Sequence, residues 1–167
     1  MNLPVSNLPA AVLSRDDIAL RIPHQGSMCL LERVQEWSAE RIRCEAISHL
    51  APDNPLRAHG RLGIACGIEY AAQAMAVHGA LLAQQAGQAG AVPLGYLAGV
   101  RGVRLHAADF NEVHGPITVR AERVMGDAVT IVYDFQVEAG ERPLIGGRAT
   151  VVLDAAAVLR PATQEST

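Results

Sequence analysis

The chain has 167 residues, of which 50% are hydrophobic and 4% aromatic, and it carries a formal net charge of −3. This length predicts a single domain over residues 1–167, with a core over about residues 18–153 and loosely held ends at residues 1–14 and 155–167. All 14 positive charges are Arg, which excludes chemistry that needs a lysine amine. The arginines are scattered and no apolar run reaches the length of a membrane span, so we expect a soluble, cytoplasmic protein that binds neither nucleic acid nor membrane.

The sequence contains no pattern typical of a metal or cofactor site. Cys29, Cys44 and Cys66 are widely spaced and odd in number, which argues against a disulfide framework and a structural zinc site. We interpret them as buried small hydrophobic residues. No His-x-His pair, Gly-x-Gly-x-x-Gly fingerprint, Walker loop or Gly-x-Ser-x-Gly elbow occurs. We therefore expect no metal and no cofactor.

The first third of the chain predicts a short helix and a hairpin. Ser14 is followed by two acids, which is typical of a helix N-cap, and Pro23 ends that helix. Residues 28–37 form an apolar lead-in to a strand, and residues 41–48 alternate as a half-buried strand does. Residues 49–63 contain two Pro and two Gly and predict a loop.

A long helix and a series of strands follow this loop. Residues 67–82 are rich in Ala and apolar nearly all round, which predicts a helix enclosed by other structure. A Gly- and Ala-rich connector over residues 85–93 leads to the remaining elements. These are four strand-like runs at residues 94–105, 116–124, 128–138 and 143–153. The order predicts an α+β fold in which an antiparallel sheet curls around one long helix.

Glu69 and Gln73 are the polar residues of the helix that attract attention. They lie four positions apart, so the acid and the amide share one helix face. A buried Glu69 needs hydrogen bonds, a shifted pKa or both, which suits an active-site wall. The simpler alternative is that the helix dipole favours Glu69 in the first turn and that Gln73 faces solvent.

The remaining polar candidates have structural explanations. His78 lies within the helix and is expected to be a core histidine with a backbone partner. Asp53 and Asn54 precede a proline and are typical of a turn, although we keep Asn54 as a candidate site residue. The other histidines near strand ends and turns are expected to be solvated: His49, His106 and His114.

Three ordered motifs resemble a known family. Pro23-His24 followed by Leu30-Leu31-Glu32-Arg33-Val34, the pair Glu69 and Gln73 on the helix, and Leu94-Gly95-Tyr96-Leu97 after it resemble the hot-dog-fold 3-hydroxyacyl-[acyl-carrier-protein] dehydratases. The further combination with Asp53-Asn54-Pro55 is similar to their aryl-polyene-type, ApeP-like branch. Three motifs in order are more specific than any one of them.

The resemblance implies a hot-dog fold and a substrate carried on the phosphopantetheine of acyl carrier protein. It also implies a homodimer or a heterodimer with a related hot-dog chain, with active sites at the subunit interface. The reaction is loss of water from a 3-hydroxyacyl thioester to give a trans-2-enoyl thioester in fatty-acid or polyene-type biosynthesis, with Glu69 as general acid and a histidine as general base. Gln73 would position the acid, and Gly67, at the helix N-terminus, would lie near the thioester oxygen.

The sequence departs from the fatty-acid enzymes in the catalytic histidine loop. Their Gly-His-Phe-Pro-Gly motif is absent, and its nearest equivalent is the segment around His59. Either His59 keeps the role or His24 takes it, and we favour His24 because its motif matches the closer branch. The alternatives are a hot-dog thioesterase, in which Glu69 activates water or attacks the thioester, and a subunit that binds acyl thioesters without turnover.

Overall fold

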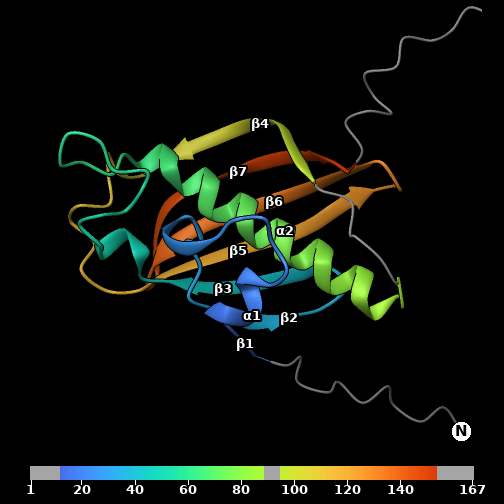
Figure 1. Ribbon diagram of the computed structural model, residues 1–167. Coiled ribbons are helices and arrows are strands. Elements are labelled where there is room, and N and C mark those ends of the chain that lie inside the picture. Colours follow the sequence, from blue (N-terminus) through green and yellow to red (C-terminus); the bar gives the residue numbers. More distant parts are fainter. Residues whose placement is uncertain (1–11, 89–94, 154–167) are drawn as a thin grey trace, which may run out of the picture.

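The computed structural model describes residues 12–88 and 95–153. Its strands form one antiparallel sheet in the order β1-β2-β3-β5-β6-β7-β4 (Figure 1). The strand bounds are β1 Leu13–Ser14, β2 Arg33–Trp37, β3 Arg41–Ala46, β4 Tyr96–Leu105, β5 Ile117–Gly126, β6 Thr130–Ala139 and β7 Arg142–Val152. The α-helices are α1 Arg15–Ala19 and α2 Gly67–Gln85, and short 3-10 turns are η1 Gly26–Met28, η2 Ser48–Leu50 and η3 Ile64–Cys66.

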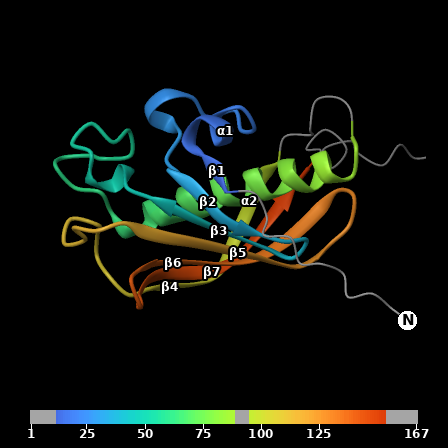
Figure 2. The ribbon, with the colours of Figure 1, turned by 90° about the horizontal axis from the view of Figure 1, so that it is seen from below.

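The long helix α2 runs across one face of the sheet (Figure 1). Seen from below, α1 lies on the same side as α2, and the sheet curves beneath them (Figure 2). This arrangement confirms the predicted α+β hot-dog fold, an antiparallel sheet around one long helix. In the part of the chain that the structure describes, no helix is long and apolar enough to cross a membrane.

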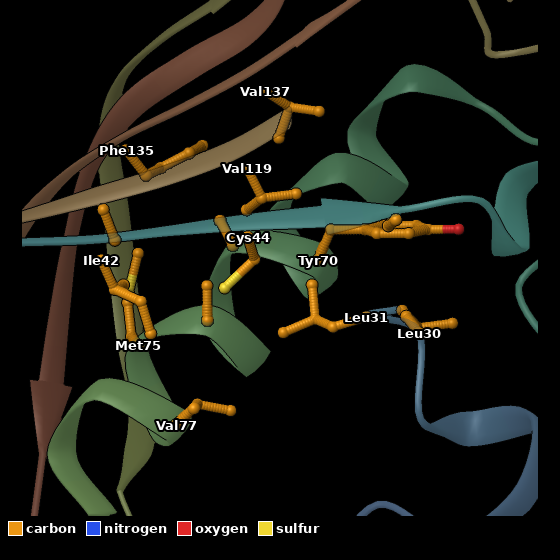
Figure 3. Packing of buried hydrophobic residues seen from close by; sticks show 14 of the residues in the cluster. Leu30, Leu31, Ile42, Cys44, Tyr70, Met75, Val77, Val119, Phe135 and Val137 are labelled. Atoms are coloured by element: carbon orange, nitrogen blue, oxygen red, sulfur yellow. The ribbon is translucent and has the colours of Figure 1, made fainter. Parts of the chain in front are cut away.

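Alternate residues of the central strands fill the space between sheet and helix (Figure 3). On β3 the buried positions are Ile42, Cys44 and Ala46, whereas Arg43 and Glu45 between them lie on the opposite face of the sheet. The strands β5 and β6 show the same alternation. Each buried aliphatic side chain contributes about 1.5–3 kcal/mol relative to its exposed state, so this layer is the main source of stability.

The middle of α2 is fastened by a buried histidine. His78 is fully buried, its Nδ1 lies 2.9 Å from the hydroxyl of Tyr133 on β6, and its Nε2 lies 2.8 Å from the carbonyl of Ser38 in the β2–β3 turn. Because the carbonyl only accepts, Nε2 carries the proton and Nδ1 accepts from Tyr133. The expectation of a core histidine with a backbone partner is confirmed.

The predicted elements agree with the structure apart from small shifts. Ser14 caps α1 in a capping box with Asp17, as its position indicated. The strand β1, which pairs with β2, was not predicted because two residues carry no period. The predictions for residues 1–11, 89–94 and 154–167 lie outside the described residues.

Candidate active site

His24 and Glu69 meet at the end of α2 that faces the loop after α1. His24 Nε2 lies 3.2 Å from Glu69 Oε1, and the two side chains are 29% and 35% exposed. Glu69 stands in the first turn of α2, where the helix dipole favours a carboxylate. A histidine and a carboxylic acid in contact, both reachable from solvent, can remove one proton and deliver another.

The loop that carries His24 is held by its neighbours in sequence. The side chain of Gln25 donates to the carbonyls of Ala19 at 2.7 Å and Ile22 at 3.3 Å, which folds the chain back on the end of α1. Ile22 is buried beside this turn. The buried Nδ1 of His24 has no partner among the described residues, so Nε2 is the nitrogen available for chemistry.

Gln73 connects Glu69 to the segment that follows His24. Its side chain is fully buried, its Nε2 donates to the carbonyl of Met28 at 2.8 Å and to Glu69 Oε1 at 3.2 Å, and its Oε1 accepts the N–H of Leu30 at 2.9 Å. The Gln73 amide therefore orients the Glu69 carboxyl group and holds the segment that follows His24 by hydrogen bonds to its backbone. The alternative in which Gln73 faces solvent is wrong, because the loop after α1 folds over this face of the helix.

Asn54 lies in a buried network next to this segment. Its Nδ2 donates to the carbonyl of Ser48 at 2.8 Å and to the hydroxyl of Tyr70 at 3.1 Å, and its Oδ1 accepts the N–H of Leu56 at 2.9 Å. Asn54 is 5% exposed. The amide hydrogens and oxygen of Asn54 are thus engaged within the chain, as the Asx turn before a proline requires.

Gly67 is a glycine for packing reasons. A Cβ at this position would lie 2.5 Å from Cγ2 of Ile145 and 3.4 Å from Cζ of Phe110, so the helix touches the sheet here. The N–H of Gly67 closes the turn η3 onto the carbonyl of Ile64. The predicted role of Gly67 near the thioester oxygen stays a prediction, and it requires that N–H to change partners.

The other predicted histidines lie apart from the contact between His24 and Glu69. His59 is exposed, with a positive φ of 52°, in a loop fastened by the ion pair between Arg61 and Asp109. His49 was expected in solvent, and that expectation is wrong. It is 1% exposed and its ring lies against Phe110, because the turn η2 directs it under the loop after β4. Burial lowers the pKa of His49.

Cysteine and metal chemistry find no support in the described part of the chain. Cys29 and Cys44 are buried, and burial raises the pKa of the half-buried Cys66, the opposite of what an activated nucleophile needs. Within residues 12–88 and 95–153, no three His, Cys, Asp or Glu side chains gather in a way that would hold a metal ion.

Comparisons with known proteins point to one family. The family model described as ApeP-like, ApeP dehydratase, matches residues 16–160. The chain is similar in structure to the dehydratase heterocomplex ApeI:P from Xenorhabdus doucetiae, with 22% identity, 90% of this chain and 93% of that chain covered and a TM-score of 0.73. No curated protein matches the chain.

Thioesterases share the fold at a greater distance. A hypothetical thioesterase with coenzyme A from Streptococcus pneumoniae is 13% identical, with 72% of this chain and 84% of that chain covered and a TM-score of 0.51. A thioesterase from Haemophilus influenzae is 11% identical, with 73% and 76% covered and a TM-score of 0.52. These likenesses show the hot-dog fold and nothing about activity.

Proposed function

Because the chain belongs to the ApeP-like dehydratase family, and so is a dehydratase, we propose that its substrates are 3-hydroxyacyl thioesters carried on acyl carrier protein. The products are trans-2-enoyl thioesters of a polyene-type biosynthesis. The observation that supports the proposal is the contact of 3.2 Å between His24 Nε2 and Glu69 Oε1, because a histidine can serve as a base and a carboxyl group as an acid. Elimination of water from a 3-hydroxyacyl thioester needs one of each.

The contacts of Glu69 Oε1 indicate which oxygen of the carboxyl group carries the proton that Glu69 delivers. Oε1 accepts an N–H from Gln73 and faces His24 Nε2. When Glu69 is protonated, its proton therefore lies on Oε2, the oxygen turned away from both partners. From Oε2 it passes to the 3-hydroxyl as the C3–O bond breaks and water leaves.

His24 takes the proton from C2 at the same centre. Its Nε2 is the exposed nitrogen, and the Nδ1–H tautomer presents the Nε2 lone pair to the substrate. The electrons of the C2–H bond form the double bond to C3, and the pair is left as an imidazolium and a carboxylate. The proton on Nε2 then passes through solvent water to Oε2 of Glu69, which restores the starting state without a metal or cofactor.

Three further residues have supporting roles in this proposal. Gln73 positions the acid through its N–H donation to Oε1. Gly67 lies at the N-terminus of α2, where the helix dipole stabilises the negative charge that the thioester oxygen gains. Asn54 shapes the wall of the acyl site from the loop between the His24 segment and α2.

Turnover of a panel of 3-hydroxyacyl thioesters on acyl carrier protein, followed by mass spectrometry, tests the proposal. Wild type should lose one water from the substrate, and Glu69→Gln and His24→Ala should each lower kcat about 10²- to 10⁴-fold. His59→Ala is the matched control and should keep wild-type activity. Loss of activity in His59→Ala with activity retained in His24→Ala would reassign the base. Release of free acid would indicate a thioesterase, and an unchanged substrate would indicate a binding subunit.

We also propose that a second hot-dog chain, a copy or a related one, covers β4. Among the strands of residues 12–88 and 95–153, this strand pairs with β7 alone and ends the sheet. Its exposed residues include Tyr96 and Leu105, at 53% and 58% exposure, and an apolar edge of this kind favours pairing with another strand. The similar ApeI:P structure is a heterocomplex. Native mass spectrometry of the purified chain tests the proposal: a dimer indicates self-pairing, whereas a monomer that dimerises with a co-expressed hot-dog chain indicates a heterodimer.

A further inference from the structure

A partly buried chain of hydroxyl groups ends on the backbone of the segment that carries His24. The hydroxyl of Ser48 lies 2.8 Å from the carbonyl of Leu30 and 2.8 Å from the hydroxyl of Tyr70. Since the carbonyl only accepts, the Ser48 proton points to Leu30, and Tyr70 must donate to Ser48. The Tyr70 oxygen in turn accepts an N–H from Asn54. Each hydrogen bond of this network therefore has a defined donor and a defined acceptor.

The network completes the fixation of Leu30 on the helix. The N–H of Leu30 is held by Gln73 at 2.9 Å, and its carbonyl is held by Ser48 at 2.8 Å. Leu30 is fully buried, so no water competes for either group. Gln73 uses its remaining N–H on Glu69. The backbone of Leu30 therefore helps to fix both Glu69, through Gln73, and the segment that carries His24.

We propose that Ser48 and Tyr70 are positioning residues for the dehydration, acting through the backbone of Leu30 and through Gln73 on the pair His24 and Glu69. This role rests on the proposed function. Neither hydroxyl touches the reacting atoms in this arrangement: Tyr70 is fully buried, and the Ser48 hydroxyl is turned toward Leu30 and Tyr70. Burial also raises the pKa of Tyr70, so its hydroxyl stays a donor at neutral pH.

The expected consequence of losing the network is a fall in kcat at nearly constant KM. Without the Ser48 hydroxyl, the Leu30 carbonyl is buried and unpartnered, and the segment from His24 to Leu30 can shift against α2. A displacement of about 1 Å at a reacting group lowers the rate about 10²-fold, whereas substrate contacts outside the network persist. We expect kcat to fall about 10- to 100-fold in Ser48→Ala and Tyr70→Phe.

The experiment compares these variants with Ser48→Thr and Tyr133→Phe in steady-state dehydration of a 3-hydroxyacyl thioester on acyl carrier protein. Ser48→Thr returns the hydroxyl and should recover most of the lost kcat. Tyr133→Phe also removes a buried hydroxyl that bonds to α2, but at His78, away from the acid. It should lower thermal stability and leave kcat and the pH profile of kcat/KM unchanged, whereas Tyr70→Phe should shift that profile.

The outcomes separate this role from the proposed function. An active wild type with Ser48→Ala and Tyr70→Phe equally active overturns the positioning role alone. Equal losses of kcat in Tyr70→Phe and Tyr133→Phe also overturn it, because the effect then follows stability. A wild type that dehydrates no member of the panel overturns the proposed function and this role with it.

Discussion

Gln73→Glu changes the site with almost no change of shape and removes both N–H donors of the side chain. In the wild type, Nε2 donates to the carbonyl of Met28 at 2.8 Å and to Glu69 Oε1 at 3.2 Å. In the variant a carboxylate oxygen takes the place of that nitrogen and faces two other oxygens. The variant keeps an oxygen that accepts the Leu30 N–H, so the substitution removes only the two hydrogen bonds that Gln73 donates.

The free energy of unfolding should fall by about 3 kcal/mol at pH 7 to 8. Each of the two hydrogen bonds contributes about 0.5–1.5 kcal/mol, and a buried oxygen left facing other oxygens adds a desolvation penalty of about 1–3 kcal/mol. The side chain is fully buried, so water does not replace either donor. A loss of this size is a large part of the ~5–15 kcal/mol that holds a domain folded.

The deficit should shrink as the pH falls. A carboxyl group buried among oxygen acceptors has a folded-state pKa above its unfolded value of about 4.3. Its stability contribution is fully present below the unfolded pKa and is lost as the pH rises through the folded pKa. Protonation also returns one donor, an O–H that reaches the Met28 carbonyl.

Urea unfolding of wild type and variant from pH 5 to 8 measures this difference. Gln85→Glu is the matched control, because Gln85 is exposed in the last turn of α2. Its difference from wild type should stay below about 1 kcal/mol and change little with pH. If Gln73→Glu were as stable as wild type at pH 7 to 8, or if its deficit were constant down to pH 5, the argument from the two donations would be refuted.

Three further predictions concern stability. Gly67→Ala should lower the free energy of unfolding by about 1–3 kcal/mol, because its Cβ would lie 2.5 Å from Ile145. Gly79→Ala, which has no atom within 4 Å of the added carbon, should raise the free energy of unfolding by about 0.5–1 kcal/mol. Thermal melts compare the two variants, and equal effects would contradict the packing account. Burial lowers the pKa of His78, so the folded chain resists a proton that the unfolded chain accepts below about pH 6.5. Stability should therefore be lost as the pH falls from about 6.5 to the folded pKa, by up to about 1.4 kcal/mol per pH unit, and urea unfolding with no slope in this range would contradict it. Ser14→Ala should cost about 1 kcal/mol through the lost capping box, which an unchanged melting temperature would disprove.

The sequence allowed most of the fold to be predicted because its signals there are local. The alternation over residues 41–48 and the Ala-rich run over residues 67–82 correspond to β3 and α2 in the structure. The Ser14 cap is likewise a property of four neighbouring residues. The exposure of β4 on both faces had no such signal, because its apolar residues look like those of a buried strand.

The wrong expectation for His49 and the alternative left open for Gln73 have a different physical cause. The burial of His49 and Gln73 depends on loops that fold back over them from distant parts of the chain. Neither loop has a period, and the partners of Gln73 at Met28 and Leu30 are backbone groups, which every residue possesses. The network of Ser48 and Tyr70 was missed for the same reason, since a serine after a strand has no distinctive spacing to an aromatic residue on a helix.

The acid and the base of this site are not positioned independently. Glu69 stands on a helix that packs against the sheet, and His24 stands on the loop that follows α1. The amide of Gln73 is what joins them, since it bonds to the acid directly and to the segment after the base through Met28 and Leu30. A displacement of the loop therefore also moves the group that orients Glu69. This coupling explains why a fully buried glutamine is placed on the helix face where an apolar residue would pack without needing partners.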